Sequence, residues 1–288
     1  MELLQLQYFR KVAELEHMTR AAEELRIAQP ALSKTISRLE EDLGVPLFDR
    51  KGRQIQLNAF GRAYLRRVET ALNALEDGKR ELEDLAGAEK GRVNLATTTH
   101  KCFSDRIGDF LGMHPGIRLQ ISQAGEQEKR DKLLSGELDL CITFPPIEQP
   151  GIEGISFLTE EILLAVPSSH RFAGRSSIRL SEAAGEAFIC IQSSNPFRKM
   201  TDQFCRLAGF EPDIVCEVDE HSAVGHFIRA GVGIAFIPET LVDRIGFSFH
   251  VLRIEEPVCR RTYQIAWQKE RYLSQAAREF RDFLVQSF

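Results

Sequence analysis

A polar cluster over residues 97–101, Thr97-Thr98-Thr99-His100-Lys101, gives the strongest small-molecule signal in this sequence. It lies at the end of a predicted strand over 92–96 and at the start of a helical stretch. Hydroxyls, free backbone N–H groups and the positive end of a helix dipole are therefore expected to converge there, which suits a carboxylate or a similar anion. In α/β sheets, ligands bind beyond the carboxyl ends of strands, where this cluster lies. A capping role for Thr98 or Thr99 alone is an equally good interpretation.

A second group of polar residues lies on one face of a predicted helix over 29–43. Leu32, Ile36 and Leu39 recur at helical spacing and define the buried face. The opposite face then carries side chains that pair with DNA: Gln with adenine, Lys with guanine or phosphate, and Pro with a thymine methyl group. These candidate readers are Gln29, Pro30, Ser33, Lys34 and Ser37. A polar helix face that only contacts solvent is the plainer alternative.

A basic turn and a threonine favour the DNA-binding interpretation. Two apolar-alternating runs over 45–57 flank Arg50, Lys51 and Arg53, which is typical of a β-hairpin with a basic tip. Thr19 is expected to cap a helix whose N-terminus suits a phosphate. Two helices joined by a tight turn and followed by a basic hairpin predict a winged helix-turn-helix. In that motif the second helix enters the major groove and the wing reaches a neighbouring groove or phosphates.

Motifs for enzymatic and metal chemistry do not assemble in this sequence. It contains no G-x-S-x-G, H-E-x-x-H or P-loop pattern and no nucleophile–base pair at a local spacing. Gly231-x-Gly233 lacks the third glycine and the acidic residue of a dinucleotide site, and it is interpreted as a turn. Cys216, His221 and His226 suggest a metal site, but no fourth ligand is evident. We therefore expect no catalytic residue, no metal and no cofactor.

Charge is unevenly distributed along the chain, whose formal net charge is −5. Residues 1–67 contain 12 Lys and Arg against 9 Asp and Glu, residues 68–90 contain 3 against 7, and the remainder contains 22 against 26. The segment with the DNA-reading pattern is thus the net positive one, which favours contact with phosphates. The six cysteines include no C-x-x-C pair, which is typical of reduced thiols inside the cell.

Length and periodicity predict more than one domain. At 288 residues the chain exceeds a typical single core. A long helix is expected from Asn58 to about Ala86, because this segment contains no proline. Its apolar residues recur with spacings of three and four, which indicates a coiled-coil seam for dimerisation. They are residues 65, 68, 72, 75, 82 and 85.

Strands alternate with helices after residue 91. The strand candidates are 92–97, 117–122, 138–144, 162–167, 187–191, 213–218, 233–237 and 261–267. Such alternation predicts a parallel, doubly wound α/β architecture. The N-terminus lacks a basic region followed by an apolar stretch, and no window approaches 18 uninterrupted apolar residues. We expect a cytoplasmic protein without a membrane partner.

Residues 3–65 resemble the N-terminal domain of LysR-type transcriptional regulators. The matching motifs are Leu6-x-x-Phe9, Ala21-Ala22-x-x-Leu25, Gln29-Pro30-Ala31-Leu32-Ser33-Lys34-x-Ile36-x-x-Leu39-Glu40-x-x-Leu43-Gly44 and Leu47-Phe48-x-Arg50. The similarity continues more loosely along the chain, where the run Ala230-Gly231-Val232-Gly233-Ile234-Ala235-Phe236-Ile237-Pro238 matches a further motif. Ala28 departs from the pattern, because many members have Ser there, so a hydroxyl contact is missing at the start of the recognition helix.

The resemblance implies a domain layout and a function. The fold class would be a multidomain α+β and α/β protein: a winged helix-turn-helix over 1–57, a linker and dimerisation helix over 58–90, and a periplasmic-binding-protein-like effector domain over 91–288. One effector subdomain would comprise 91–160 and 265–288, and the other 161–264. A small anionic metabolite bound between the subdomains would control sequence-specific binding to promoter DNA.

The resemblance also implies further site residues and partners. The chain would associate with itself as a homodimer and a homotetramer, and it would contact RNA polymerase. The additional effector contacts would be Thr143 and Phe144 on the hinge side, Gln192, Ser193 and Ser194 on the opposing wall, and the weaker candidates His221 and Ser222.

Two other classes of protein share parts of this pattern. A solute-binding protein would have the α/β half, but it would carry an export signal and lack the basic winged helix, so residues 1–57 discriminate against it. An α/β enzyme of unknown substrate is the other alternative, and the missing catalytic motifs discriminate against it.

Overall fold

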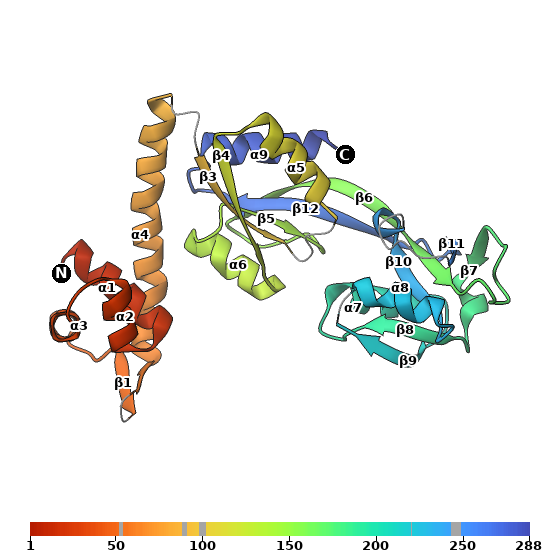
Figure 1. The fold of residues 1–288 in the computed structure, drawn as a ribbon, viewed down its shortest axis with the longest axis horizontal. Coiled ribbons are helices and arrows are strands. Elements are labelled where there is room, and N and C mark those ends of the chain that lie inside the picture. Colours follow the sequence, from red (N-terminus) through yellow and green to blue (C-terminus); the bar gives the residue numbers. More distant parts are fainter. Residues whose placement is uncertain (52–53, 88–90, 98–101, 220, 243–248) are drawn as a thin grey trace.

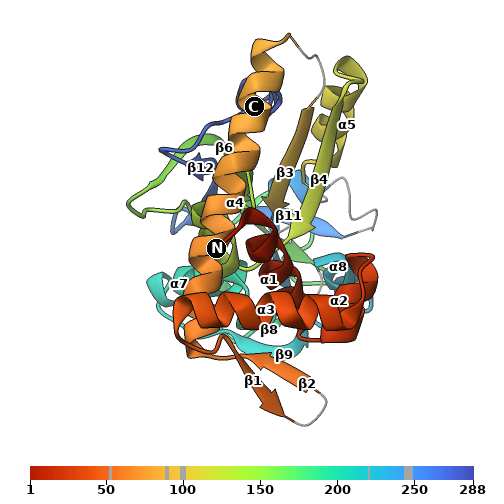
Figure 2. The ribbon, with the colours of Figure 1, turned by 90° about the vertical axis from the view of Figure 1, so that its left-hand side faces the viewer.

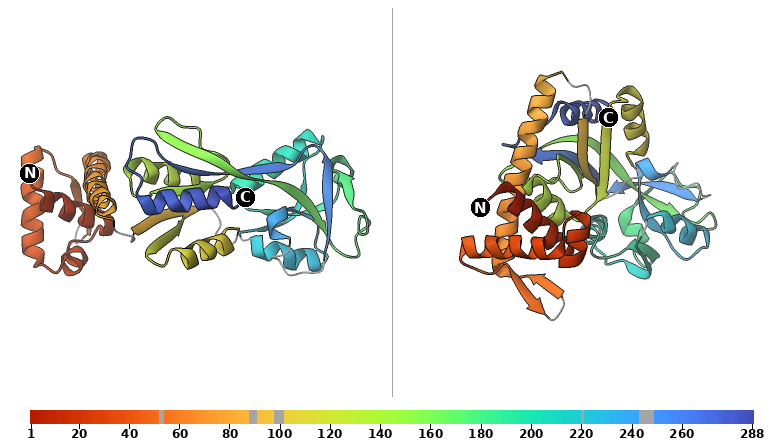
Figure 3. Two further views of the ribbon diagram at one scale, coloured as in Figure 1. Left: turned by 90° about the horizontal axis from the view of Figure 1, so that it is seen from above. Right: turned by 60° about the vertical axis from the view of Figure 1, so that its left-hand side comes forward.

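The computed structural model describes residues 1–51, 54–87, 91–97, 102–219, 221–242 and 249–288, without the side chains of 50, 51, 54, 221 and 222. A small helical domain with a two-stranded hairpin lies at the N-terminus, and a long helix connects it to a larger α/β region (Figure 1). Seen from above, the α/β region extends away from this helix as two successive lobes (Figure 3).

The N-terminal domain confirms the predicted helices and hairpin. Its core is one apolar cluster that includes Phe9, Leu32, Ile36 and Leu39. Phe9 packs edge-on against Phe48 with ring centroids 5.6 Å apart, which joins the hairpin to the first helix. The elements are α1 (Leu3–Leu15), α2 (Met18–Glu24), α3 (Gln29–Leu43), β1 (Phe48–Lys51) and β2 (Gln54–Leu57).

The predicted cap of α2 is wrong. His17 is the N-cap, because its Nδ1 accepts a hydrogen bond of 3.3 Å from the backbone N–H of Arg20. Thr19 lies two residues further on, in the first turn of α2, with an exposed side chain. The end of α3 agrees with the prediction, since Gly44 closes it in the left-handed conformation at φ 73°.

The linker helix α4 (Ala59–Leu85) lies within one residue of the predicted bounds, and Asn58 is its N-cap. The predicted apolar seam divides into two parts. Val68 and Leu72 are buried in the core of the N-terminal domain of the same chain, so they are not available to a partner. The other part is exposed to solvent: Leu75 is 59% exposed, Leu82 68% and Leu85 78%.

The α/β region is built on a mixed sheet in which eight strands pair among the described residues. Seven follow the order β4-β3-β5-β12-β6-β11-β7, and β10 also pairs with β6. They are β3 (Gly91–Thr97), β4 (Ile117–Gln123), β5 (Leu140–Thr143), β6 (Ile152–Val166), β7 (Ser177–Arg179), β10 (Ala235–Pro238), β11 (His250–Glu256) and β12 (Arg260–Gln268). A smaller parallel pair consists of β8 (Ala187–Ile191) and β9 (Asp213–Val218).

The predicted all-parallel architecture is wrong at the centre of this sheet. β3 pairs in parallel with β4 and β5, as the alternation of strands and helices predicts. In contrast, β12 pairs antiparallel with β5 and β6, and β6 pairs antiparallel with β10 and β11. The sequence does not predict β7, β11 or the first half of β6. The first half of β6 is mostly exposed and therefore lacks the apolar run that marks a buried strand.

The two lobes share β6 and β12, which run through both (Figure 1). We call the lobe with β3, β4 and β5 subdomain 1 and the lobe with β8, β9 and β10 subdomain 2. The predicted subdomain boundaries, between 160 and 161 and between 264 and 265, fall inside these shared strands. The helices of subdomain 1 are α5 (Ser104–Met113), α6 (Glu126–Ser135) and α9 (Gln275–Gln286), and those of subdomain 2 are α7 (Pro196–Leu207) and α8 (His221–Arg229).

The Gly231-x-Gly233 motif forms a structural turn between α8 and β10. Gly231 adopts φ 76°, a conformation that favours glycine. A Cβ atom at Gly233 would lie 2.4 Å from the carbonyl oxygen of Ala187, so no larger residue fits beside β8. The same carbonyl accepts a hydrogen bond of 2.8 Å from the N–H of Ile234. Both glycines are therefore explained by packing of the backbone.

An ion-pair cluster attaches α4 to subdomain 1. Arg271 donates from Nε and Nη2 to the two carboxylate oxygens of Asp77 at 2.5 and 2.7 Å. Arg80 donates to Asp139 at 2.7 Å, and Arg271 lies 3.2 Å from the same carboxylate. None of the four side chains is more than 18% exposed. We call Asp77, Arg80, Asp139 and Arg271 the linker cluster.

Neighbouring hydrogen bonds extend this contact along α4. The Asn73 amide donates to the carbonyl oxygen of Ser135 on α6 at 2.7 Å. The Asp84 carboxylate accepts from the Tyr272 hydroxyl and from the Gln275 N–H, each at 2.7 Å. The linker helix is therefore held to subdomain 1 over several turns.

Arg271→Gln is expected to lower the free energy of unfolding by about 3 kcal/mol, since removing the arginine leaves the buried carboxylate of Asp77 without its hydrogen-bonded partner, whereas Asp139 keeps Arg80. Lys269→Gln is the matched control. Lys269 lies 3.3 Å from Glu153 but is 60% exposed, so we expect a loss of at most about 0.5 kcal/mol. Urea unfolding measures both values. Equal losses in the two variants would contradict a stabilising role for the linker cluster.

Candidate DNA-binding surface and effector site

Helix α3 presents the predicted reading face outward. Gln29, Pro30 and Lys34 are exposed, and Ser33 and Ser37 are half-buried beside them. The apolar residues of the same helix are buried against α1 and α2. The hairpin projects from the domain next to α3, so both elements are accessible from the same side (Figure 2). A recognition helix needs this geometry to enter the major groove.

Two carboxylates hold the hairpin against the helices. Glu40 Oε1, on α3, accepts hydrogen bonds from the N–H groups of Leu47 and Phe48 at 2.7 and 3.3 Å. Glu16 Oε1, just after α1, accepts from the N–H of Leu57 at 2.8 Å. The hairpin is therefore bonded at one end to α3 and at the other to the residue that follows α1, which holds the wing in place beside the recognition helix.

The predicted wing residues fall at the far end of the hairpin. Arg50 and Lys51 are the last two residues of β1. Their side chains, and Arg53 as a whole, lie outside the described residues. Their role in binding phosphates stays a prediction.

Two further arginines add positive charge to this domain. Arg20, in the first turn of α2, and Arg38, on α3, are both exposed. Arg38 lies four residues after Lys34 and therefore shares its helix face. Helical spacing carries the signal for Arg38, whereas nothing in the sequence distinguishes Arg20 from other surface arginines.

Two buried threonines mark the strand ends of subdomain 1. Thr97 is the last residue of β3 and Thr143 the last of β5, and each is 1% exposed. Parallel pairing sets Thr97 opposite Ile142, so the two strands end together. This is the edge of the sheet where α/β proteins bind ligands. The other members of the predicted cluster lie outside the described residues: Thr98, Thr99, His100 and Lys101.

The loop after β8 leads into α7, as predicted. Asn195 caps α7, because its side chain accepts a hydrogen bond of 2.9 Å from the N–H of Phe197. The predicted contact residues of this loop are exposed, and they are Gln192, Ser193 and Ser194. The remaining two candidates begin α8, and their side chains lie outside the described residues: His221 and Ser222.

A buried ion pair that no sequence motif reveals lies on the shared strands β6 and β12, close to Phe144 of subdomain 1 and Phe197 of subdomain 2. Arg261, on β12, donates from Nε to Glu160 Oε1, on β6, at 2.6 Å, and the side chains are 4% and 2% exposed. The Arg261 Cζ lies 5.8 Å from the ring centroid of Phe144 and 5.4 Å from that of Phe197. Phe144 follows β5 in subdomain 1, and Phe197 belongs to α7 in subdomain 2. The structure thus places Phe144, a predicted hinge residue, and Phe197 of subdomain 2 on the same guanidinium.

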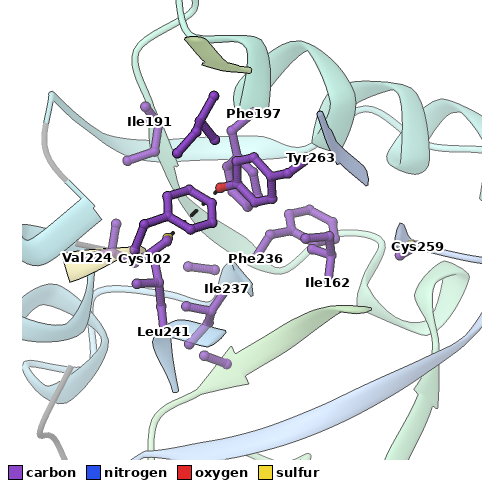
Figure 4. Close-up of a cluster of buried hydrophobic side chains, with 14 of the residues drawn as sticks. Cys102, Ile162, Ile191, Phe197, Val224, Phe236, Ile237, Leu241, Cys259 and Tyr263 are labelled. Atoms are coloured by element: carbon purple, nitrogen blue, oxygen red, sulfur yellow. Dashed lines mark hydrogen bonds between the residues drawn. The ribbon is translucent and has the colours of Figure 1, made fainter. Parts of the chain in front are cut away.

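Tyr263 lies beside this ion pair, within the apolar core (Figure 4). Its hydroxyl donates to Cys102 Sγ at 3.9 Å, and its ring centroid is 4.7 Å from the Arg261 Cζ. Burial raises the pKa of Tyr263 well above its usual value, so the hydroxyl remains a hydrogen-bond donor at neutral pH. The period-two pattern Arg261-x-Tyr263-x-Ile265 is the sequence signal, because it directs all three side chains to the buried face of β12.

A second buried cation lies next to Thr143. Lys129, on α6, is fully buried and donates from Nζ to Thr143 Oγ1 at 3.1 Å. Burial lowers the pKa of Lys129, although Cys141 and Glu126 act in the opposite direction. The spacing from Lys129 to Leu133, one helical turn later and also buried, is the sequence signal for this inward position.

The described side chains form no arrangement suited to metal or redox chemistry. In the part of the chain that the structure describes, no three His, Cys, Asp or Glu side chains gather to hold a metal ion. The cysteines are free thiols, and burial raises the pKa of Cys141 to about 12 and that of Cys190 to about 11. Such thiols are poor nucleophiles at neutral pH. No helix among the described residues has the length and apolar character needed to cross a membrane.

A winged helix-turn-helix with a polar reading face, joined by a long helix to a two-lobed α/β module, defines a DNA-binding regulator with an attached effector domain. Two family models match this chain. The model "Bacterial regulatory helix-turn-helix protein, lysR family" matches residues 3–62, and the model "LysR substrate binding domain" matches residues 86–288. The chain belongs to the LysR family of transcriptional regulators.

Relatives and solved structures agree with this assignment over the full chain. The HTH-type transcriptional regulator YybE of Bacillus subtilis is 38% identical over 291 residues, which cover 100% of this chain and 99% of YybE. A full-length OxyR variant from Pseudomonas aeruginosa has the same fold, with a TM-score of 0.80, 24% identity and coverage of 99% and 94%. Full-length CbnR, solved with its target DNA, has a TM-score of 0.74, 24% identity and coverage of 100% of both chains.

Lys129→Met is expected to change how stability depends on pH. Because burial lowers the folded-state pKa of Lys129 below 10.5, the charged lysine destabilises the folded state at neutral pH. This penalty disappears as pH rises towards 10.5, where the lysine loses its proton in both states. The free energy of unfolding, wild type minus variant, should therefore rise between neutral pH and 10.5. Denaturant unfolding at several pH values measures this difference.

Lys132→Met, one turn along the same helix, is the matched control with the opposite sign. A hydrogen bond that Lys132 donates to Glu137 raises the pKa of Lys132, so the stabilising contribution of this lysine is complete below 10.5 and is lost as pH rises through the folded-state value. A wild-type-minus-variant difference for Lys129→Met that does not change with pH would contradict a buried, charged lysine.

Proposed function

We propose that this chain binds promoter DNA sequence-specifically as a homodimer, and that a small anionic metabolite bound between its two effector subdomains controls this binding. The observation that carries the proposal is the outward face of α3, held beside a basic hairpin by Glu40. Its partners are double-stranded promoter DNA, a second copy of the chain, a small-molecule effector and RNA polymerase, and its location is the cytoplasm.

The polar face of α3 enters the major groove in this proposal. The side chains of Gln29 and Lys34 reach base edges, and Ser33 and Ser37 contact bases or phosphates. Thr19, at the start of α2, is positioned for a phosphate, because the first turn of a helix offers free N–H groups. The arginines and lysine of the wing bind the backbone of a neighbouring groove, so binding should weaken steeply with salt. The fold shared with DNA-bound CbnR supports this arrangement.

The double variant Ser33→Ala, Lys34→Ala tests the reading face. Loss of base contacts is expected to weaken operator binding by about 1–3 kcal/mol per contact, while binding to unrelated DNA changes little. Lys11→Ala is the control, because it also removes one cation from the domain. Lys11 belongs to α1 and not to α3, and it pairs with Glu14 on α1. Gel-shift titrations with operator and competitor DNA measure the discrimination. Undiminished discrimination in the double variant would remove this surface from the proposal.

The exposed leucines of α4 support dimerisation through this helix. Leu75, Leu82 and Leu85 continue the three-and-four spacing beyond the part of the helix that packs on its own domain. Large exposed apolar residues in a row indicate a protein interface. A homotetramer, built from two such dimers, is what the family resemblance implies.

Leu82→Glu combined with Leu85→Glu is expected to shift the full-length chain towards monomer, because two carboxylates would face each other across the helix pair. Leu207→Glu is the matched control: this leucine, on α7, is 66% exposed and lies far from α4 in the sequence. Sedimentation velocity at micromolar concentration gives the assembly state. A double variant that sediments like the wild type would contradict dimerisation through α4.

Polar groups on both lobes support an effector site between the subdomains. Subdomain 1 contributes Thr97 and Thr143 at the ends of two neighbouring strands. Subdomain 2 contributes the exposed loop over 192–194 before α7. The chemistry of Thr98, His100 and Lys101 adds hydroxyl, imidazole and ammonium groups, which favours an anion over a neutral compound.

A further inference from the structure

Arg261 holds a hydrogen-bond donor that the described residues leave unused. Its guanidinium is 5% exposed, and Nε donates to Glu160 at 2.6 Å. Nη2 is buried and has no hydrogen-bond acceptor among the described residues. Buried polar groups in proteins almost always have partners, because an unpaired donor loses its hydration without compensation. Since the described residues supply no acceptor, the unpaired Nη2 is available to a group that completes this site.

Glu160 does not supply the missing acceptor, because its carboxylate is already shared. Oε1 accepts from Arg261, while Oε2 accepts from the N–H and the hydroxyl of Thr240 at 2.9 and 2.7 Å. These bonds fix Arg261 on β12 and leave its outer nitrogen for another anion. A planar guanidinium is suited to a carboxylate, since it donates parallel hydrogen bonds in a fixed geometry.

The side chains around Arg261 indicate the chemistry of the rest of the ligand. Three aromatic rings, from Phe144, Phe197 and Tyr263, lie with centroids 5.8, 5.4 and 4.7 Å from its Cζ. Phe144 belongs to subdomain 1 and Phe197 to subdomain 2. A ligand with an apolar body and one carboxylate would satisfy Nη2 and contact both phenylalanines, so its binding would favour the state in which the two lobes approach each other.

We propose that Arg261 is the carboxylate receptor of the effector site and that Phe144 and Phe197 enclose the apolar part of a small organic acid. This inference rests on the proposed control of the regulator by a metabolite, and it assigns the selectivity of that control to a residue of the shared strand β12. Glu160 acts as a positioning residue, because it orients the guanidinium without reaching the ligand.

Matched pairs of acids and amides test the assignment on the full-length protein. The probes are benzoate against benzamide and succinate against succinamide, each titrated by calorimetry. Wild type should bind at least one acid on the order of tenfold more tightly than its amide, as a charge-assisted hydrogen bond predicts. The variant is Arg261→Gln with Glu160→Gln, because a single substitution would leave Glu160 buried without its partner. This double variant should lose the preference for the acid.

Arg260→Gln is the matched control, since Arg260 is the neighbouring residue on β12, is 58% exposed and pairs with Glu161 at 3.3 Å. It should keep the wild-type preference. Thermal unfolding of each variant verifies a cooperative fold. A second readout is the side-chain NMR signal of Arg261 in wild-type protein, which should move on addition of the acid and stay in place on addition of the amide.

The outcomes separate this assignment from the proposed function. An acid bound equally well by wild type and the double variant overturns the role of Arg261 but leaves metabolite control intact. Amides bound as tightly as acids by wild type overturn the carboxylate class. If no acid or amide binds, and neither alters operator binding in gel shifts, this assignment fails together with control by anions.

Discussion

The antiparallel pairing of β6 with β12 is the constraint on which the effector domain depends. The two strands pair from Arg260 opposite Glu161 to Gln268 opposite Ile152. One half of β12 also pairs with β5, whereas the far half of β6 pairs with β10 and β11. Each lobe is therefore built on its own end of the same two strands. A change in the angle between the lobes has to bend this pair, and the register shift after Tyr263 lies in its middle.

The linker cluster decides which lobe moves with the DNA-binding domain. Val68 and Leu72 join α4 to the core around α3, and Asp77 joins the next turns of α4 to Arg271 in subdomain 1. The reading helix, the linker helix and subdomain 1 thus form one mechanical unit within a chain. Subdomain 2 is attached to this unit through β6 and β12. In the proposed mechanism, effector binding that moves subdomain 2 reaches the DNA through contacts with other copies of the chain, so self-association takes part in the proposed control.

Local patterns predict the N-terminal domain well because its contacts are local. The spacing of Leu32 and Leu39 defines the buried face of α3 correctly, since helix geometry alone relates these positions. The cap of α2 is missed, because both His17 and Thr19 offer an acceptor and only the backbone decides between them. Arg261 is missed for a different reason: its partner, Glu160, lies 101 positions earlier. Strand register across such a distance is set by the whole sheet, so the period-two pattern of β12 indicates that Arg261 faces inward but not which residue it pairs with.

The proposed effector control has an energetic limit that makes the dimer necessary. A ligand shifts a conformational equilibrium by no more than the ratio of its affinities for the two states. One charge-assisted contact such as that of Arg261 provides a ratio on the order of 10 to 100. Moving a two-state equilibrium from almost fully off to almost fully on requires about 10⁴. Two identical sites that bias one shared equilibrium multiply their ratios, so a dimer with both sites occupied reaches between about 100 and about 10⁴, where a monomer remains between about 10 and about 100.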